Sequence, residues 1–528
     1  MSWREQLPST AALLCEGGDE RLALCAVKGS NKYGCRPQPD PLCAEFGSST
    51  ATSISSHAFD AAEAMRRQLL ASPSRTSAAK AYAQAMDDVR NKLLNWCGLQ
   101  DIKGLATLFA ASGTDLHLIA SQLMSQGTSQ PPLVIMMDGC ETGSGVANAV
   151  AGHHFAEQSA GGRRHQIGAP LNSGHVGAHA VQVVQLPIRQ ADGQPRPQDE
   201  VERHITHLVD GAALNQRKVL LIGLDISKTG LQVPSQSFMQ ALRQQWPQHL
   251  SVLVDACQFR LSNASLRSYL DSGFMVAMTG SKFLTGPSFC GALLIPADHA
   301  IRLSKQPLPE GLRQYCAQAE WPVGWRASSQ LPARANFGLL LRWTACLSEL
   351  HAFRQLPDAH IRHFLKVFAT CIQRHLAHSD AFELLPTPEL VRPIPGEWDS
   401  WQTIYPFVLW RTTPDGQRLP LSPAQTHEVY QLLQGGVSSE PQVTDLALPP
   451  LRGQLGQPVS CGHRQGVPVT ALRLCVSARL IVEAVSHRGD HAEAVIQRAL
   501  ALLDRTEALI QTLYPSTNKE PHHAPSLP

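Results

Sequence analysis

The sequence has almost no net charge, no long apolar run and no signal-peptide pattern. Its 45 lysines and arginines against 43 aspartates and glutamates give a formal charge of +2. This balance offers no electrostatic basis for binding nucleic acid or an acidic membrane surface. No apolar run reaches the roughly 18 residues of a membrane span, and Met1–Glu5 does not begin a signal peptide. We therefore expect a soluble, cytoplasmic protein that binds neither nucleic acid nor membranes.

Paired cysteine motifs and several common catalytic motifs are also missing. The 13 cysteines are odd in number and lack CxxC spacing, which predicts reduced structural thiols rather than disulfides. The chain has no P-loop and no Ser-His-Asp pattern, and the segment from Gly143 to Asn148 lacks the third glycine of a dinucleotide fingerprint. His487 and His491 have the i, i+4 spacing of metal ligands, but the Arg-Gly-Asp between them favours a solvated turn. We predict no metal site.

What is present is a long α/β pattern. From residue 104 onward apolar strand-like runs alternate with helical segments, which predicts a mainly parallel sheet covered on both faces. The expected strands are Leu105–Ala110, Leu133–Met137, Val181–Leu186, Val219–Leu224, Ser251–Val254 and Phe274–Met278. Gln158–Gly177, rich in glycine, histidine and arginine, is interpreted as a surface insertion or flap.

With 528 residues, 43% of them apolar, the chain is long enough for two domains with terminal arms. We predict an irregular N-terminal arm over 1–56, a large α/β domain over 57–345, a small α+β domain over 346–515 and a disordered tail over 516–528. A long helix near Asn336–His351 would lead into the small domain. Its expected elements are helices at Ile361–Leu376, Pro423–Leu433 and Ala492–Leu513 and strands at Thr403–Trp410 and Thr470–Cys475.

Asp255 and Lys282 stand at the exits of two neighbouring apolar strands. In an open α/β sheet, ligands bind at the carboxyl ends of the strands. The flanking Thr279-Gly280-Ser281 and the turn at Gly286-Pro287 favour a desolvated lysine that can form a Schiff base over an ordinary exposed lysine. Lys228 is the rival lysine, but it precedes Asp255 and no second apolar strand follows it. A carboxylate at Asp255 would need a cation, because an unpaired buried charge is costly.

Pyridoxal 5′-phosphate meets these requirements, since its ring nitrogen offers the cation and its aldehyde reacts with the lysine. Its phosphate needs an anion cradle. Ser112, Gly113 and Thr114 stand between a strand and a helix, where backbone amides at the helix N-terminus favour phosphate. The alternative is an ordinary helix cap. Thr279 and Ser281 could complete the cradle from the lysine side.

Six motifs in this order resemble one enzyme family. They are SGTD at 112–115, ETGSG at 141–145, SKTG at 227–230, DACQ at 255–258, TGSKF at 279–283 and LRLCVS at 472–477. The set, over roughly residues 100–515, resembles the class V aminotransferase superfamily of fold type I, which also contains cysteine desulfurases and kynureninases. The resemblance implies a homodimer with sites at the interface, which the arm over 1–56 could cover.

The resemblance also implies roles for individual residues. Lys282 would form the Schiff base, Asp255 would pair with the pyridinium nitrogen, and Gln258 and Ser227 would approach the ring hydroxyl. Gly113, Thr114 and Thr279 would hold phosphate. Glu141-Thr142 lies where many relatives place a ring-stacking histidine; threonine cannot stack in that way, and His153 or His154 might substitute for it.

Arg473 stands where relatives keep the arginine that grips the substrate carboxylate, although it could instead be a surface strand residue. Bidentate geometry is the physical reason for arginine there. A desulfurase would need a mobile nucleophilic cysteine upstream, and Cys461 is a poor candidate because its context and spacing differ. We therefore expect a pyridoxal-phosphate-dependent aminotransferase acting on an amino acid, with a β-lyase or desulfurase-type reaction second and a degenerate binding homologue third.

Overall fold

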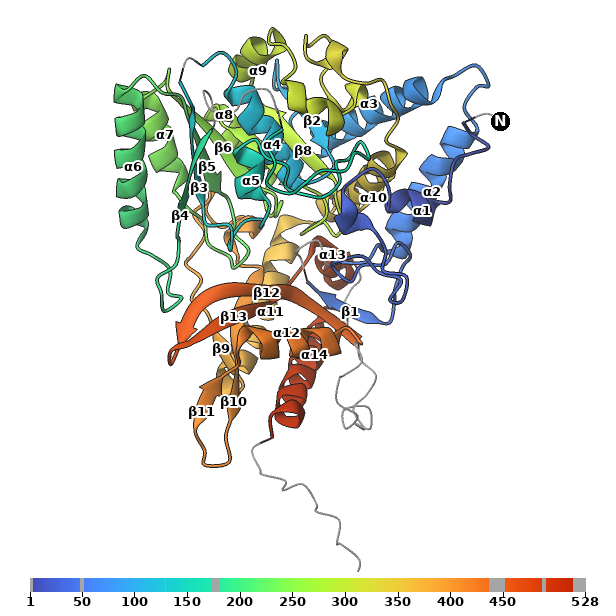
Figure 1. Cartoon of the computed structure of the whole chain (residues 1–528). Coiled ribbons are helices and arrows are strands. Elements are labelled where there is room, and N and C mark those ends of the chain that lie inside the picture. The colour runs from blue at the N-terminus through green and yellow to red at the C-terminus, as the bar shows by residue number, and fades with distance from the viewer. Residues whose placement is uncertain are drawn as a thin grey trace, which may run out of the picture.

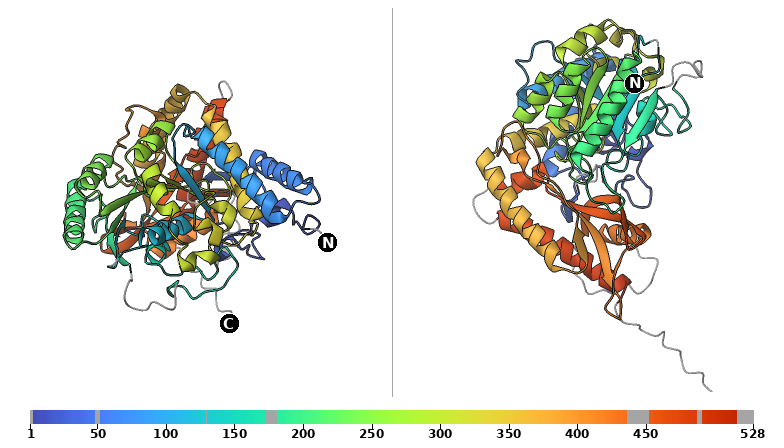
Figure 2. Two further views of the ribbon diagram at one scale, coloured as in Figure 1. Left: turned by 90° about the horizontal axis from the view of Figure 1, so that it is seen from above. Right: turned by 90° about the vertical axis from the view of Figure 1, so that its left-hand side faces the viewer.

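The computed structural model describes residues 3–47, 52–128, 130–171, 181–435, 452–486 and 491–515. The predicted tail over 516–528, the end of the predicted insertion and the metal alternative at His487 lie outside these residues. Two sheets with their helices lie one above the other in Figure 1, and the side view in Figure 2 shows the same two lobes. We name the seven-stranded sheet of the upper lobe sheet I and the six-stranded sheet of the lower lobe sheet II.

Sheet I has the strand order β2-β8-β7-β6-β5-β3-β4. All neighbouring strands are parallel except at β8, which runs antiparallel to both β7 and β2. The predicted α/β class with a mainly parallel sheet is therefore confirmed. The strands are β2 Ala106–Ala110, β3 Leu133–Met137, β4 Gln182–Leu186, β5 Val219–Leu224, β6 Leu250–Ala256, β7 Met275–Thr279 and β8 Gly291–Ile295.

Helices cover sheet I on both faces, as the near-continuous apolar strands predicted. In β3, Ile135 packs into one apolar core and its neighbours Val134 and Met136 pack into a second core on the opposite face. The helices of this lobe and of the N-terminal segment are α1 Thr10–Leu14, α2 Ser56–Leu70, α3 Ala78–Trp96, α4 Gly113–Met124, α5 Val146–Val150, α6 Gln198–Leu214, α7 Gln236–Gln245, α8 Asn263–Asp271, α9 Ala297–Ser304 and α10 Phe337–Arg354.

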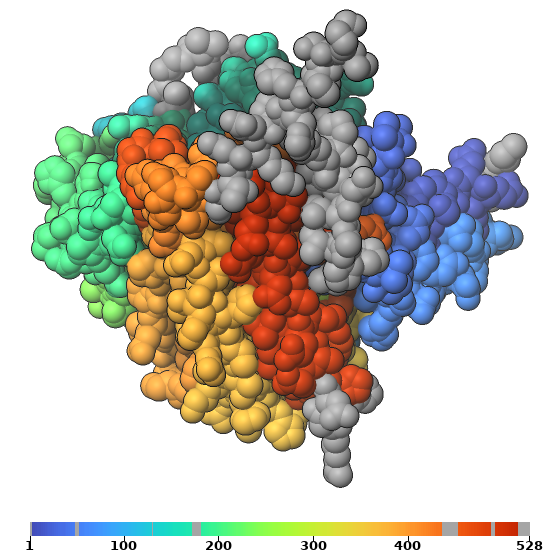
Figure 3. All heavy atoms as spheres, turned by 90° about the horizontal axis from the view of Figure 1, so that it is seen from below, coloured from blue at the N-terminus to red at the C-terminus, as the bar shows by residue number. Residues whose placement is uncertain are grey.

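Sheet II has the order β1-β12-β13-β10-β11, with β9 also paired to β10. Its strands are β1 Cys43–Phe46, β9 Phe382–Leu384, β10 Ile404–Thr412, β11 Arg418–Pro420, β12 Arg452–Arg464 and β13 Val467–Cys475. The helices around it are α11 Asp358–His378, α12 Pro423–Leu433, α13 Ala478–Ser486 and α14 His491–Leu513. Seen from below in Figure 3, α11 and α14 lie side by side on the surface of this lobe.

The N-terminal segment is more ordered than its sequence predicted. Residues 31–41 are irregular as expected, but the segment also forms α1, a 3-10 turn at Glu20–Leu22 and strand β1. Strand β1 pairs in parallel with β12, so the segment is part of sheet II. Arg342 on α10, fully buried, donates hydrogen bonds to the carbonyl oxygens of Leu14, Glu16 and Gly17. The segment is thereby fastened to the body of its own chain.

Within the described residues, no helix combines the length and the apolar character that crossing a membrane requires.

Candidate active site

A cavity opens at the carboxyl ends of β6 and β7, as expected for an open α/β sheet. Residues of sheet I, of sheet II and of the N-terminal segment line it together. Among the predicted site residues, those that line it are Ser112, Gly113, Thr114, Thr142, Asp255, Gln258, Thr279, Ser281, Lys282 and Arg473. Ser227 does not belong to this lining. The structure thus brings together side chains separated by up to 361 positions in sequence, since both Ser112 and Arg473 contribute.

The predicted phosphate cradle is the start of α4. Ser112 is the N-cap of this helix, and its hydroxyl and the carboxylate of Asp115 form a reciprocal capping box. A β-carbon added at Gly113 would lie 2.9 Å from Cys257 Sγ and 3.3 Å from Thr279 Cγ2, so glycine permits the close packing of α4 on the strand ends. The helix cap that the sequence allowed is therefore present, and the role of this helix N-terminus in phosphate binding stays a prediction.

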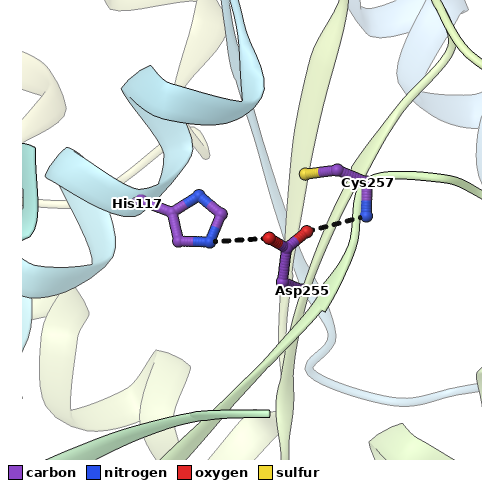
Figure 4. A group of neighbouring side chains, drawn as sticks. All are labelled: His117, Asp255 and Cys257. Carbon is purple, nitrogen blue, oxygen red and sulfur yellow. Dashed lines mark hydrogen bonds and ion pairs between the residues drawn. The ribbon is translucent and has the colours of Figure 1, made fainter. Parts of the chain in front are cut away.

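Asp255 lies at the end of β6 and is buried. Its Oδ1 accepts a hydrogen bond from the Cys257 amide at 3.0 Å, and its Oδ2 lies 3.3 Å from His117 Nε2 (Figure 4). Burial alone would raise the pKa of this carboxyl, but the positive charges of His117 and Lys282 hold it well below its usual range. Asp255 is therefore an anion at neutral pH, ready to face a cationic ring nitrogen.

His117 is a site residue that sequence reasoning missed. It lies on α4 one turn beyond Gly113, whose carbonyl oxygen accepts a hydrogen bond from His117 Nδ1 at 2.7 Å. Burial would lower the pKa of His117, yet the charge of Asp255 raises it above its ordinary value. The imidazole is thus a proton-bearing partner of the carboxylate. The i, i+4 spacing from Gly113 was a signal that could have placed it on the cavity face of the helix.

His117, Asp255 and Cys257 also form a compact group with donor atoms within 4.8 Å of one another. Their chemistry does not suit a metal ion. Burial and the charge of Asp255 raise the pKa of the Cys257 thiol well above its ordinary value, so it stays protonated. The raised pKa of His117 acts in the same direction, because metal binding requires the deprotonated forms of both side chains.

Ser227, predicted to approach the ring hydroxyl, is held by a different partner. Its hydroxyl donates a hydrogen bond to Glu141 Oε2 at 2.8 Å. Glu141 also accepts hydrogen bonds from Thr229 Oγ1 at 2.6 Å and from Arg189 Nε at 2.8 Å. The buried carboxylate therefore ties the Ser227–Thr229 turn to the loop that follows β3.

The two candidate lysines, Lys282 and Lys228, line the same cavity. Lys228 Nζ donates a hydrogen bond to the carbonyl oxygen of Cys140 at 3.0 Å. Burial, followed by the positive charges of Arg473 and Lys282, lowers the pKa of Lys228 to about 8. The two lysines that the sequence offered as candidates for the Schiff base therefore belong to one site.

Arg473 projects from β13 into the cavity and is fully buried. Its Nη1 donates to the carbonyl oxygen of Lys228 at 3.3 Å and its Nη2 to that of Gln457 at 2.8 Å. A β-carbon at Gly456 would come within 2.9 Å of the guanidinium, so a glycine on the neighbouring strand β12 makes room for it. The alternative of a surface strand residue is incompatible with this burial.

The N-terminal segment supplies two lining residues that the sequence did not predict, Arg21 and Tyr33. Arg21 forms hydrogen bonds to Asp19 at 2.8 and 2.5 Å and lies over the ring of Phe289, 4.6 Å from its centroid. The segment thus borders the cavity of its own chain. His154, suggested as a ring cover, is outside the lining and bonds Tyr315 Oη at 2.6 Å instead.

No family model and no curated protein matches this sequence. Solved structures do match. The cysteine desulfurase CsdA from Escherichia coli is 16% identical with a TM-score of 0.51, over 89% of this chain and 95% of that chain. The C-DES mutant with glycine covalently linked to its PLP cofactor is 16% identical with a TM-score of 0.51, over 86% and 96%.

The cystine C–S lyase C-DES in complex with cysteine persulfide is 16% identical with a TM-score of 0.52, over 86% of this chain and 97% of that chain. At this identity the likeness concerns the fold. The coverage, 86% to 89% of this chain and 95% to 97% of the matched chains, shows that the likeness extends over both lobes. This chain therefore has the fold of CsdA and C-DES, the fold type I that its six motifs resemble.

Proposed function

We propose that this protein binds pyridoxal 5′-phosphate and uses it to transform an amino acid. The observation that carries the proposal is the meeting of Asp255 and Lys282 in one cavity beside the N-terminus of α4. A buried carboxylate with a lowered pKa suits a protonated ring nitrogen, a lysine suits the aldehyde, and a helix N-terminus suits the phosphate. The residues present therefore fit this cofactor.

The cofactor would supply an aldehyde that links to amino groups and a ring that accepts electrons. Asp255 would keep a proton on the ring nitrogen, and His117 would hold Asp255 in its anionic form. Lys282 would move protons at the α-carbon of the substrate as general base and acid. Arg473 would orient the substrate through its α-carboxylate, with Gln258 and Thr279 beside the ring and the phosphate.

For the reaction we propose transamination, with carbon–sulfur or other β-elimination as the alternative. Two of the solved structures of similar fold support the β-elimination alternative, because they are a cysteine desulfurase and a cystine C–S lyase. The position of Cys461 does not support it as the nucleophilic cysteine of a desulfurase-type reaction. That thiol is buried outside the cavity lining, and burial raises its pKa to about 11. The β-elimination alternative is thus one that needs no cysteine nucleophile.

An absorbance spectrum of the purified protein with added cofactor tests the proposal. We expect a visible band that the Lys282→Ala variant loses, and borohydride reduction should leave a pyridoxyl group on the Lys282 peptide. Lys218→Ala, at an exposed lysine just before β5, is the matched control and should keep the band. No band in the wild type, or an unchanged band in Lys282→Ala, would contradict the proposal and favour a degenerate homologue that only binds ligands.

Incubation with amino acids, with and without a keto acid, separates the two reactions. Transamination requires the keto acid as amino acceptor, and the product is a new amino acid. Pyruvate or sulfide released without any keto acid would reject transamination and favour elimination.

A further inference from the structure

The cavity is lined by more cationic than anionic side chains. Its charged lining residues are Arg21, His117, Lys228, Lys282, Arg473 and one carboxylate, Asp255. Arg21 is paired with Asp19, His117 is paired with Asp255, and Lys282 is the proposed point of cofactor attachment. Lys228 and Arg473 are the other two cations, and the acceptors of their hydrogen bonds described above are backbone carbonyl oxygens.

Lys228 is held in place from both ends. Its backbone amide donates to the carbonyl oxygen of Glu141 at 3.0 Å, and its Nζ donates to that of Cys140 at 3.0 Å. The next residue, Thr229, is fixed by two hydrogen bonds to the Glu141 carboxylate. The amine therefore stands at a defined position in the cavity wall and does not swing freely.

No carboxylate in the described part of the chain forms an ion pair with Lys228. Glu141 is the adjacent acid, but its oxygens already accept hydrogen bonds from Arg189, Ser227 and Thr229. The acceptor of the Lys228 ammonium is a neutral carbonyl oxygen, and an ammonium can donate three hydrogen bonds. Two donor positions are thus available to a ligand in the cavity.

Lys228 and Arg473 are also joined to one another. The Arg473 guanidinium donates to the backbone carbonyl oxygen of Lys228, so the two cations approach the cavity from adjoining positions in the turn after β5 and on β13. An α-carboxylate bound by Arg473 would leave Lys228 within reach of a group a few bonds further along the same substrate. A neutral side chain there would leave a partly buried ammonium without a counter-charge, which is unfavourable.

We infer that Lys228 is a specificity residue that binds a second acidic group, so the substrate is an amino acid with an acidic side chain. The inference rests on the function proposed above, because it places the substrate α-carboxylate on Arg473. The lowered pKa of Lys228, about 8, supports it: a cation crowded by Arg473 and Lys282 gains from an anionic ligand. The alternative is that Lys228 only secures the loop at Cys140.

Substrate binding by the holoenzyme distinguishes the two roles. Aspartate and glutamate are compared with asparagine and glutamine, which have the same shape without the charge, by titrating the cofactor spectrum and by calorimetry. We expect the acids to bind at least about tenfold more tightly than the amides, which is the affinity difference expected for one charge-assisted hydrogen bond. Lys228→Met should abolish this preference while changing amide binding less than about threefold, and Lys228→Arg should keep part of it.

The pH dependence of substrate affinity is a second measurement, and a lysine with a purely structural role would not affect it. The affinity for aspartate should fall as pH rises through about 8, where free Lys228 loses its proton, relative to the affinity for asparagine. Lys228→Met should remove this difference. Equal loss of acid and amide binding in Lys228→Met, or no acid preference in the wild type, would overturn the inference. Absence of the cofactor band would instead reject the proposed function itself, so the two failures are distinguishable.

Discussion

At the scale of single residues, His117 determines how Asp255 is charged. The folded pKa of Asp255 is lowered, so its contribution to stability is present above the unfolded pKa of about 4 and lost as pH falls. The folded pKa of His117 is raised, so its contribution is present below about pH 6.5 and lost as pH rises through the raised value. The pair should therefore stabilise the fold most between these two limits.

The variant His117→Gln tests this pair in cofactor-free protein. We expect it to lower the free energy of unfolding by about 3 kcal/mol near pH 5.5, the cost of leaving a buried charge without one partner. The difference from the wild type should shrink as pH rises through the raised pKa of folded His117, where the imidazole loses its proton. Urea unfolding followed by circular dichroism measures it. His360→Gln, an exposed histidine on α11, is the control, and a pH-independent difference would contradict the charge-pair interpretation.

The sequence made Asp255 and Lys282 predictable because each stands at the exit of an apolar strand, and strand ends meet at one edge of a sheet. The partners of individual side chains were not predictable in this way. Nothing in the local sequence shows that Glu141 and Ser227, 86 positions apart, share a hydrogen bond. The same holds for Asp255 and His117, whose contact depends on how α4 packs across the end of β6.

At the scale of elements, the N-terminal segment depends on Arg342. This buried guanidinium also donates to the carbonyl oxygen of Phe289 at 2.7 Å, and burial lowers its pKa to about 10. Its hydrogen bonds go to the segment and to the loop before β8, and charged donors to carbonyl oxygens are stronger than neutral ones. Arg342 thereby links the segment that carries Arg21 to the wall of the cavity.

We predict that Arg342→Met releases the segment before it unfolds the rest of the chain. Trypsin cleavage at Arg21, Lys28 or Lys32 should accelerate at least about tenfold, the factor for about 1.4 kcal/mol of local opening. Mass spectrometry of a short digestion locates the cuts, and Arg203→Met on the exposed face of α6 is the control. Cleavage spread over the whole chain at the same rate would show that Arg342 supports the core and not the segment alone.

β12 is one of the elements that the sequence did not indicate. Its glycines at 453, 456 and 462 and its proline at 458 have the composition of a turn, and strand propensity is low for both residue types. The structure shows why they are there: a β-carbon at Gly456 would meet Arg473, one at Gly453 would meet Leu502, and the pairing with β13 has register shifts. Because β12 was missed, its partner β1 was missed as well.

At the scale of the whole molecule, one apolar core joins the two lobes. Residues of α10, which spans the proposed domain boundary at 345/346, pack in the same cluster as residues of β6 and of β13. Leu341, Val254 and Leu472 are examples. The strand ends of sheet I and the strand that carries Arg473 are therefore held in a fixed relation within one chain.

This arrangement leads to a prediction about the proposed homodimer. Lys282 and Arg473 of the same chain line one cavity, so each chain should contain both residues of its own site. Equal mixtures of Lys282→Ala and Arg473→Met, refolded together, should recover no turnover. If the two residues served different chains of a dimer, mixed dimers would restore about a quarter of the sites.

The measurement needs evidence that the chains exchange, because separate dimers would also give no activity. A tagged copy of one variant, captured after mixing, should carry the other, and light scattering should give about twice the 57.4 kDa of one chain. Recovered turnover in captured mixed dimers would mean that Arg473 acts across the interface, contrary to the cavity described here. A monomeric mass with cofactor and turnover intact would reject the homodimer while leaving the site within one chain.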